Sequence, residues 1–258
     1  MSRLIFLGTG TSQGIPMIGC RCEVCTSRDS RDKRLRSSVF IEHKGVKFVI
    51  DTGPDFRYQM LRDDITDIDA ILFTHPHKDH TAGLDDVRAY NYFLNRSIDI
   101  YAEEHTMKAI KNEFSYAFND KEKYPGVPEI TPHIITTEPF SVKGVTVIPV
   151  RGIHLKMPVL GFRIGDISYI TDMNSIEDEE IEKLRGSKVL VVDALRKGKH
   201  LSHFSLPEAI EVAKKVNAEV AYFTHISHQM GLYAETSAEL PENMHLSYDR
   251  LAIDTDKL

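Results

Sequence analysis

The sequence predicts a single mixed α/β domain. The chain has 258 residues, of which 41% are hydrophobic and 27% are charged. This size and balance are typical of a globular protein with one sizeable core. Apolar runs of strand length alternate with segments of helix length along the chain. The sequence shows no low-complexity segment, no repeat of solenoid period and no linker long enough to divide it. One domain is therefore the simplest arrangement.

The first half is predicted to be rich in strands. Two β-rich runs on either side of Lys44-Gly45 indicate a hairpin. A later apolar run leads directly into a histidine-rich loop, and a stretch with three prolines is expected to be a loop. The predicted elements are strands at Ser2–Leu7, Val39–Glu42, Val46–Ile50 and Ile68–Thr74, a helix at Glu103–Tyr116 and a loop at Lys121–Pro132.

The second half alternates strands with helices. Its best-marked helix begins after Ser205, because Ser205 and Glu208 have the spacing of a capping box. The predicted strands are Val145–Val150, Leu160–Ile164, Ile167–Ile170, Lys188–Val192 and Val220–Phe223, and the predicted helices are Ile176–Leu184 and Leu206–Val216.

Charge and hydropathy narrow the class of protein. The formal net charge is −6, whereas a general nucleic-acid binder is expected to be basic, so nucleic acid is a disfavoured partner. No apolar run approaches the roughly 18 residues needed to span a bilayer. The apolar stretch Leu4–Leu7 is too short for the core of a signal peptide. We therefore expect a cytoplasmic protein without a membrane partner.

All three cysteines lie in one short segment, at Cys20, Cys22 and Cys25. An odd number of cysteines in one tight cluster does not make a disulfide framework. Three thiols in one loop instead suit most of a tetrahedral zinc site, which needs a fourth ligand from elsewhere. A reducing compartment fits this interpretation. Three ordinary free thiols are the alternative.

The histidine-rich loop is the strongest chemical signal. Positions 74–80 read Thr-His-Pro-His-Lys-Asp-His, directly after a predicted strand. Four good metal ligands in so few residues are rarely found without something to bind. A polar surface loop is the alternative. The candidate ligands are His75, His77, Asp79 and His80.

Three further candidate ligands, His154, Asp172 and His225, follow other predicted strands. Strand ends at one edge of a sheet are where residues distant in sequence converge. Each residue alone has an ordinary explanation. Together with the loop they provide seven nitrogen and oxygen ligands, which suit two divalent metal ions about 3.5–4 Å apart with one bridging carboxylate. Zinc, manganese and iron all accept such ligands.

The pattern His-x-His-x-Asp-His, followed by a later His, an Asp and a final His, resembles the metallo-β-lactamase superfamily of binuclear metallohydrolases. The resemblance covers nearly the whole chain, including Phe6–Gly10, Ile50–Gly53 and Thr224-His225. It implies a four-layer αββα sandwich, with residues 1–258 as one hydrolase domain. Histidine at position 77 is typical of hydrolases, whereas diiron redox members commonly carry a carboxylate there.

The resemblance also assigns roles to the candidate ligands. Asp172 would bridge the two metals, and Asp51 would be a buried organiser of the histidine loop. The first metal would be held by His75, His77 and His154, and the second by Asp79, His80 and His225.

The segment from His203 to Ala209 looks like the His-Ser-Thr-x-x-Glu-Ala element of phosphodiesterase members such as the tRNA 3′-processing endonucleases. In those enzymes the histidine assists proton transfer at the phosphate. Here His203 lies two residues before the expected helix cap Ser205, so a helix N-terminus would favour an anion beside it. His200 is a weaker candidate for the same role. A solvated loop residue is the alternative for His203.

The three cysteines together with His228, three residues after His225, look like the PhnP-type cyclic phosphodiesterases. Those enzymes carry an additional structural zinc bound by three cysteines and one histidine. A site of this kind would hold the loop near 20–25 against the strand end that bears His225.

The resemblance implies a metal-dependent phosphodiesterase that hydrolyses a small cyclic phosphate such as 5-phosphoribosyl 1,2-cyclic phosphate. In this hypothesis Asp79 or Asp172 orients the attacking water, and His203, as an imidazolium, donates a proton to the leaving oxygen. The substrate phosphates need cationic partners, and we select Arg88, Arg196 and Lys199 for that role, with His200 beside them. The cofactors expected are two catalytic divalent metals, zinc or manganese, and one structural zinc.

The main alternative is a tRNA 3′-processing endonuclease, which would share the binuclear site. Against it, the chain shows no long basic arm for gripping tRNA, and Asp193–His200 lacks the His-Glu-Ala-Thr signature of those enzymes. A silent scaffold is disfavoured because no ligand is lost. A thioester hydrolase or a lactamase fits the fold alone. The sequence is compatible with a homodimer, which is common among relatives, without a feature that requires one.

Overall fold

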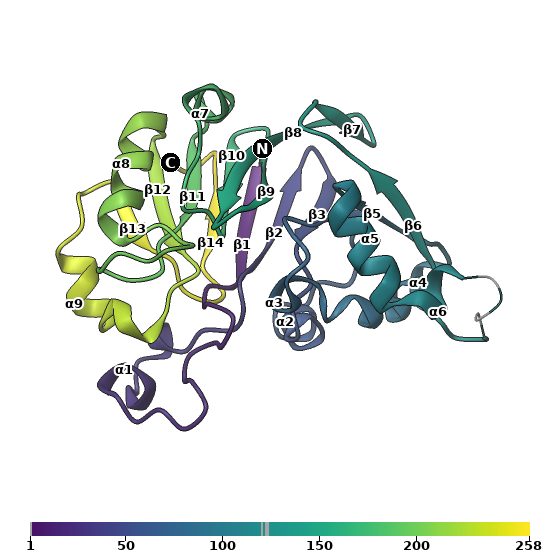
Figure 1. The fold of residues 1–258 in the computed structure, drawn as a ribbon, viewed down its shortest axis with the longest axis horizontal. Helices are drawn as coiled ribbons and strands as arrows, with labels where there is room; N and C mark the ends of the chain where they lie inside the picture. Colours follow the sequence, from purple (N-terminus) through teal and green to yellow (C-terminus); the bar gives the residue numbers. More distant parts are fainter. Residues whose placement is uncertain (1, 120, 122–123) are drawn as a thin grey trace.

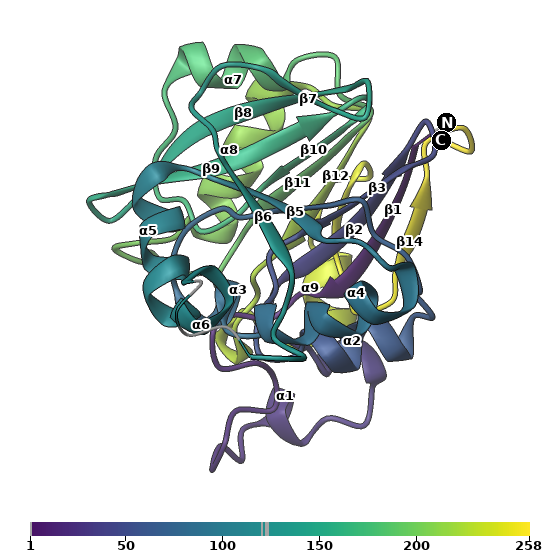
Figure 2. The same ribbon diagram turned by 90° about the vertical axis from the view of Figure 1, so that its right-hand side faces the viewer.

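Two β-sheets lie face to face at the centre of the molecule, and helices cover the outer face of each sheet (Figures 1 and 2). The computed structural model describes residues 2–119, 121 and 124–258, and within these ranges each sheet has seven strands. This four-layer αββα arrangement confirms the fold predicted from the sequence.

The first sheet is mixed. Its strands β3 to β6 run parallel to one another, whereas β14, β1, β2 and β3 pair antiparallel. In spatial order the strands are β14 (Ala252–Asp254), β1 (Ser2–Gly8), β2 (Ser38–His43), β3 (Val46–Ile50), β4 (Ala70–Leu72), β5 (Ile98–Ala102) and β6 (Ile130–Ile134).

The second sheet follows the same plan. Its strands β10 to β13 are parallel, and β7 to β10 pair antiparallel. In spatial order the strands are β13 (Met244–Leu246), β12 (Val220–Thr224), β11 (Val189–Asp193), β10 (Ile167–Ile170), β9 (Met157–Ile164), β8 (Val145–His154) and β7 (Phe140–Val142).

The helices are short and fall into two groups. The first sheet is covered by α2 (Phe56–Arg62), α4 (Arg88–Leu94) and α5 (Glu104–Glu113), with α3 (Lys78–Thr81), η2 (Leu84–Val87) and α6 (Ser115–Phe118) nearby. The second sheet is covered by α7 (Asp178–Leu184), α8 (Leu206–Val216) and α9 (Tyr233–Ala238). The remaining turns are α1 (Glu23–Thr26), η1 (Ser30–Asp32) and η3 (His228–Met230).

Apolar side chains fill each interface between the layers. Phe6, Phe48 and Phe162 are fully buried between the two sheets. Phe56, the first residue of α2, packs in the core between the first sheet and its helices, and Val216, the last residue of α8, packs in the core of the second sheet and its helices. Burial of a large apolar side chain contributes about 1.5–3 kcal/mol. These layers therefore hold the strand ends in fixed relative positions.

The structure extends or shortens several predicted elements. The predicted strand Val145–Val150 continues to His154, and the predicted strand Ile68–Thr74 is limited to Ala70–Leu72. The predicted loop Lys121–Pro132 is wrong at its end, because β6 begins at Ile130 and includes Pro132 at the sheet edge. Residues 122–123 of that loop lie outside the described ranges. The predicted helix at Ile176–Leu184 begins two residues later, at Asp178.

Other predictions agree closely with the structure. The helix α8 has the predicted bounds, and its capping box is present, with the Ser205 N–H donating to Glu208 Oε2 at 2.9 Å. Such a cap contributes about 1 kcal/mol. The hairpin turns at Lys44 and Gly45, both of which have positive φ, as a two-residue turn requires.

Candidate active site

The candidate ligands converge where strands of both sheets end. In the first sheet Asp51 directly follows β3, and the histidine loop follows β4. In the second sheet Asp172 follows β10, and His225 directly follows β12. Because these strands run parallel within each sheet, their carboxyl ends lie at one edge.

Three of these residues adopt the left-handed backbone conformation, although none is glycine. The φ angles are +65° at Asp51, +59° at Asp172 and +55° at His225. This conformation costs roughly 1–2 kcal/mol per residue. Residues retained at such a cost cluster at functional sites, where the backbone must turn to aim a side chain.

Asp172 lies at the centre of the cluster. Its Oδ1 is 2.9 Å from His225 Nδ1, and its Oδ2 is 3.3 Å from His80 Nε2 and 3.7 Å from His75 Nε2. A carboxylate placed among ring nitrogens from both sheets suits the bridging role expected for Asp172.

Several buried ring nitrogens in this cluster lack a hydrogen-bond partner. These are Nε2 of His75, Nε2 of His80 and Nδ1 of His225. His225 Nδ1 lies close to Asp172 Oδ1 but does not form a hydrogen bond with it. Buried polar atoms are normally paired, so nitrogens that converge unpaired fit the binding of cations between them.

The predicted ligands are brought together by the fold. Three groups have ligand atoms within 4.8 Å of one another, and Asp172 belongs to all three. The rings of His77 and His154 lie 5.1 Å apart at the outer side of the cluster. The groups are His75, His80 and Asp172; His154, Asp172 and His203; and Asp79, Asp172 and His225. The division into two metal sites expected from the sequence stays a prediction, because here His75 groups with His80 and His203 groups with His154.

Asp51 contacts the histidine loop through both of its carboxylate oxygens. Its Oδ1 accepts a hydrogen bond from the Thr74 backbone N–H at 2.9 Å, and its Oδ2 lies 2.7 Å from His80 Nδ1. His80 Nε2 faces Asp172 and Asp79, so a proton kept on Nδ1 by Asp51 would leave Nε2 available to a metal ion. Such carboxylate–histidine pairs fix the ring orientation of metal ligands. This geometry agrees with the organising role expected for Asp51.

The ionisation states of several side chains in the cluster favour the binding of cations. Burial opposes ionisation of Asp172, but His225 and His80 outweigh burial and hold the pKa of Asp172 well below its usual range. The pKa of Asp79 is lowered in the same way, mainly by His80 against the effect of burial. Burial lowers the pKa of His75. Ionised carboxylates next to a neutral imidazole are the form of these side chains that binds divalent metals.

His203 lies beside the ligands on the second-sheet side. Its ring centroid is 4.7 Å from that of His154 and 4.8 Å from that of His225. Burial lowers the pKa of His203 to about 3. The imidazolium expected from the sequence is therefore not the resting form at neutral pH, because taking a charge into this buried position is unfavourable. An anionic phosphate beside the ring would raise this pKa.

Sequence reasoning missed Asp193. This buried residue ends β11, and its Oδ2 lies 3.8 Å from His203 Nδ1. Its carboxylate accepts hydrogen bonds from the backbone N–H groups of Met173 at 2.9 Å and Phe204 at 3.3 Å. It thereby joins the segment after Asp172 to the segment that carries His203. Its position at the end of a predicted strand could have identified Asp193, as the same position identified Asp172.

The second-sheet ligand loops are also tied to each other. His154 Nδ1 donates to the backbone carbonyl of Ser202 at 2.7 Å. His200, two residues earlier, lies 5.3 Å from His203 between ring centroids. The structure therefore places His200 near the candidate proton donor, and its role in binding substrate stays a prediction.

Two of the predicted cationic residues, Arg196 and Arg88, pair with groups of the protein itself. Arg196 donates to Gln229 Oε1 at 2.7 Å and to the Lys199 carbonyl at 2.8 Å. Arg88 pairs with Asp85. Both guanidinium groups are thus held by acceptors of the protein itself, and a substrate would have to displace those acceptors. Their role in binding phosphate stays a prediction.

The three cysteines form a second cluster around one histidine. His228 Nδ1 lies 3.3 Å from Cys20 Sγ, 3.3 Å from Cys22 Sγ and 3.7 Å from Cys25 Sγ. Hydrogen bonds from the Cys25 backbone and from His228 lower the pKa of Cys22 to about 6, whereas burial raises the pKa of Cys25 to about 11. Three sulfurs and one nitrogen that converge on a common point suit a tetrahedral zinc ion.

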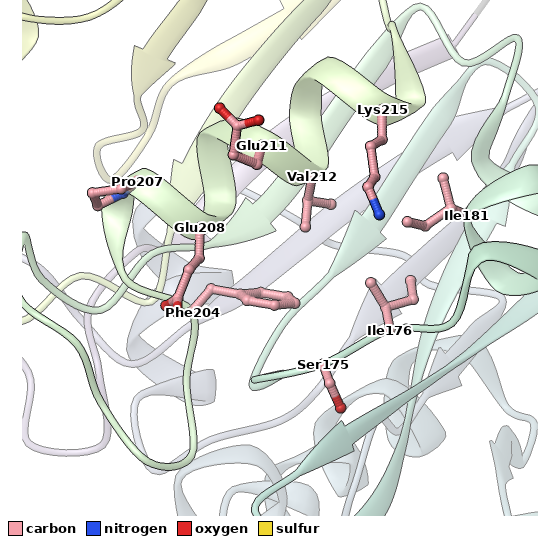
Figure 3. Close-up of a pocket in the computed structure, with 9 residues that line it drawn as sticks. All are labelled: Ser175, Ile176, Ile181, Phe204, Pro207, Glu208, Glu211, Val212 and Lys215. Atoms are coloured by element: carbon pink, nitrogen blue, oxygen red, sulfur yellow. The ribbon is translucent and has the colours of Figure 1, made fainter.

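A cavity of about 360 Å³ lies between α7 and α8 (Figure 3). Phe204 forms part of its wall, and Ile176 and Val212 lie near it in the view. None of the predicted metal ligands lines this cavity. The cavity is therefore separate from the cluster of candidate metal ligands.

Comparisons with known proteins agree with this fold. A family model described as the β-lactamase superfamily domain matches residues 47–226. The chain belongs to the metallo-β-lactamase superfamily of metal-dependent hydrolases, which confirms the identification made from the motifs. Within this superfamily it is similar to the solved structure of a diphosphatase from the PhnP family, with 40% identity, a TM-score of 0.91 and coverage of 98% of each chain.

Two further proteins are similar to this chain. The chain is 39% identical over 262 residues to an octanoyltransferase of Porphyromonas gingivalis. That alignment covers 99% of this chain and 52% of the relative, so the chain spans about half the length of that protein. Human tRNase Z, short form, has a TM-score of 0.72 at 18% identity, over 98% of this chain and 99% of that one, and shows a shared fold. In the described part of the chain, no helix is both long and apolar enough to cross a membrane.

Proposed function

We propose that this chain hydrolyses a small phosphate ester at a binuclear metal centre formed by the His/Asp cluster. The observation that carries the proposal is the position of Asp172, which lies within 3.7 Å of ring nitrogens of His75, His80 and His225. A shared carboxylate among unpaired nitrogens is the arrangement that two-metal phosphoesterases use.

Each residue of the cluster has a distinct role in this proposal. When bound, two divalent metals would supply Lewis acidity and lower the pKa of a water between them. His75, His77 and His154 would hold one ion, Asp79, His80 and His225 the other, and Asp172 both. Asp79 would also accept a hydrogen bond from the attacking water and orient it toward phosphorus.

His203 would provide the proton for the leaving oxygen. The ring is neutral in the free site, because burial lowers its pKa to about 3. A phosphate anion close to the ring favours its charged form. Asp193, 3.8 Å from His203 Nδ1, would hold the ring in place from the other side. Substrate binding would thereby create the acid that the reaction needs.

The substrate class proposed is a small cyclic phosphate such as 5-phosphoribosyl 1,2-cyclic phosphate. The PhnP-family relative, at 40% identity over 98% of both chains, supports a phosphate substrate. Because that relative is named as a diphosphatase, a phosphoric anhydride is a further member of the class to be tested. Cleavage of a tRNA precursor remains the alternative within phosphodiester chemistry.

The cysteine cluster is proposed to bind a structural zinc. It connects the loop that bears Cys20, Cys22 and Cys25 with η3, three residues beyond the ligand His225. The backbone of Ile226 is held by the N-terminal loop, since its N–H donates to the Thr9 carbonyl at 2.9 Å. An ion at this point would stiffen one wall of the active site.

A second candidate function is hydrolysis of an acyl thioester. Two observations favour it. A relative that aligns with 99% of this chain is named an octanoyltransferase, and two exposed leucines lie next to the candidate site. Leu155 follows His154 and is 56% exposed, and Leu201 follows His200 and is 82% exposed. Apolar side chains at these positions could contact an acyl chain.

The deciding experiment is a substrate panel with purified, metal-analysed protein. The panel contains 5-phosphoribosyl 1,2-cyclic phosphate, a 2′,3′-cyclic nucleotide, a nucleoside diphosphate, a linear aryl diester, a precursor tRNA and an octanoyl thioester. We expect the small cyclic phosphates to have the highest kcat/KM, and Asp172→Asn to abolish their turnover. Preference for the thioester or the tRNA would overturn the proposal in favour of that class.

A further inference from the structure

The short helix α3 lies against the backbone that follows β3. Its residues Asp79 and His80 are candidate ligands, and the adjoining segment contains Asp51, which contacts the His80 ring. The Thr52 N–H donates to the His80 carbonyl at 2.7 Å, and the Gly83 N–H donates to the Thr52 carbonyl at 2.8 Å. These two backbone hydrogen bonds hold α3 at a fixed distance from the end of the strand.

Gly53 lies where the two segments are closest. A β-carbon at this position would lie 2.2 Å from the Asp79 carbonyl oxygen and 3.2 Å from the Asp79 carbonyl carbon. Non-bonded atoms do not approach so closely. The clash is with backbone, which cannot turn away as the end of a flexible side chain can. A side chain at Gly53 would therefore push the backbone of Asp79 away by roughly 1 Å.

Gly83 stands in a similar position on the other side of the contact. A β-carbon there would lie 2.2 Å from the Gly53 carbonyl oxygen and 2.8 Å from Phe56 Cβ. The φ angle of Gly83 is −91°, and the φ angle of Gly53 is not positive either. Alanine could adopt such backbone angles. Both positions therefore exclude a side chain through lack of space and not through backbone conformation.

The position of Asp79 matters because a metal site tolerates little displacement of its ligands. Metal–ligand distances vary by only about ±0.2 Å, so a shift of roughly 1 Å in the backbone of a ligand exceeds this tolerance. Asp79 Oδ2 lies 3.2 Å from His80 Nε2, and ligand atoms of Asp79, Asp172 and His225 lie within 4.8 Å of one another. A displaced Asp79 would leave this group.

We propose that Gly53 and Gly83 are positioning residues for one of the two metal ions. Without a β-carbon they allow α3 to approach the end of β3, and this approach sets where Asp79 stands relative to Asp172. The inference rests on the binuclear centre of the proposed function, and it adds that the two ions depend on different parts of the backbone. The ion held by Asp79 depends on the two glycines. The other ion, assigned to three histidines outside α3, does not.

The test measures the binding of Mn²⁺ to the full chain by electron paramagnetic resonance of the free ion. Mn²⁺ suits oxygen and nitrogen ligands, whereas thiolates such as those of the cysteine cluster select softer ions. A titration therefore gives the number and affinity of the ions held by the His/Asp cluster. It is performed on the wild-type protein, on Gly53→Ala and on two controls, and melting temperatures are measured for each.

The two controls separate space from stability. Gly198→Ala adds the same β-carbon at a position where no atom lies within 4 Å. Gly165→Ala is a destabilising change far from the ligands, in the turn between β9 and β10. Gly165 has a φ of +56°, and its β-carbon would lie 2.3 Å from His43 Cε1.

We expect the wild-type protein and both controls to bind two Mn²⁺ ions. Folded Gly53→Ala should bind one ion with unchanged affinity and the other about 10–100-fold more weakly, the usual effect of altering groups that orient a metal ligand. A merely structural role would instead give Gly53→Ala and Gly165→Ala the same binding curve when their melting temperatures fall equally.

Two ions bound with wild-type affinity by folded Gly53→Ala would overturn the inference and leave the binuclear centre intact. Equal weakening of both ions, or the same loss in Gly165→Ala, would also overturn it. A wild-type chain that binds fewer than two ions would overturn the binuclear centre and the inference with it. If Gly53→Ala does not fold, Gly83→Ala provides the same comparison. If neither variant folds, the glycines are required by the whole fold and the positioning role is wrong.

Discussion

The molecule has two clusters of metal-ligating side chains, and they are assembled in different ways. The cysteine cluster takes three of its four residues from positions 20–25 and the fourth from His228. The His/Asp cluster collects its residues from the ends of strands in both sheets, from Asp51 to His225. The first cluster is therefore mainly local in sequence, whereas the second depends on the packing of the whole sandwich.

This difference has a functional consequence. A site made from both sheets can place ligands on opposite sides of a substrate, and it is supported by the apolar layer between the sheets. A site made from one loop and one distant residue mainly fixes that loop. We therefore expect changes in the His/Asp cluster to affect chemistry, and changes in the cysteine cluster to affect stability. The following predictions test that separation.

The largest effect is expected for Asp172→Asn. Loss of the shared carboxylate charge should release metal from the His/Asp cluster and lower kcat/KM at least about a thousandfold, because the metal contribution amounts to several kcal/mol. The cysteine cluster should keep its zinc. Metal content by mass spectrometry and turnover of the cyclic phosphate are the measurements. Asp166→Asn, a change of the same type in the turn before β10, is the matched control. Full metal content in folded Asp172→Asn would contradict the bridging role.

His203→Ala should separate proton transfer from metal binding. We expect the metal content to remain that of the wild type and kcat to fall by roughly 10²–10⁴-fold, the usual contribution of a general acid. The exposed histidine His245 on β13 provides the control His245→Ala. If the variant retains full activity on substrates with a poor leaving group, then His203 is not the proton donor.

Cys20→Ser should show the reverse pattern. The variant is expected to lose one equivalent of zinc and to melt at a lower temperature, because metal binding contributes to folding. Its kcat/KM should fall by about tenfold or less, since the cysteine cluster supports the catalytic cluster only through neighbouring backbone. Metal analysis, thermal unfolding and kinetics at saturating catalytic metal measure the three quantities. Loss of both metal populations at once would show that the clusters are not separable.

The smallest expected effect is a pH dependence of zinc affinity at the cysteine cluster. The bound ion requires thiolates. Without metal, Cys25 is protonated at neutral pH because its pKa is raised to about 11, whereas Cys22, with a pKa of about 6, is mostly ionised. Zinc binding at pH 7 should therefore release protons, and affinity should fall as pH falls, more steeply below about pH 6, where Cys22 is also protonated. Calorimetry in buffers of different ionisation enthalpy measures this release. Affinity that does not change with pH would contradict thiolate ligation.

Much of the candidate site could be predicted because its residue types and their spacing indicate metal binding even without a structure. The loop that contains His75 and His80 has a density of ligands that is rare by chance, and His225 stands at the end of an apolar strand run. Asp193 was missed because a single aspartate after an apolar run is common. Its role became visible only through its hydrogen bonds to the backbone of Met173 and Phe204.

The predicted cationic contacts rest on a weaker signal, and their role in binding phosphate stays a prediction. Arg196 and Arg88 were selected because they lie near motifs in the sequence, but proximity along a chain does not give the direction of a flexible side chain. In the structure these guanidinium groups pair with Gln229 and Asp85. The helices α2 and α4 and the strand β6 were also not predicted, because each is too short to show a clear hydrophobic period.

The amino-acid sequence by itself determined the alternation of strands and helices, the superfamily and the set of candidate ligands. These properties depend on local hydrophobic patterns and on residue types, which do not require knowledge of distant contacts. Only the tertiary structure decided that Asp172 lies between ring nitrogens of both sheets and that His203 is buried with a lowered pKa. The position, burial and charge state of these side chains are set when segments distant in sequence pack together. Packing is a property of the whole molecule.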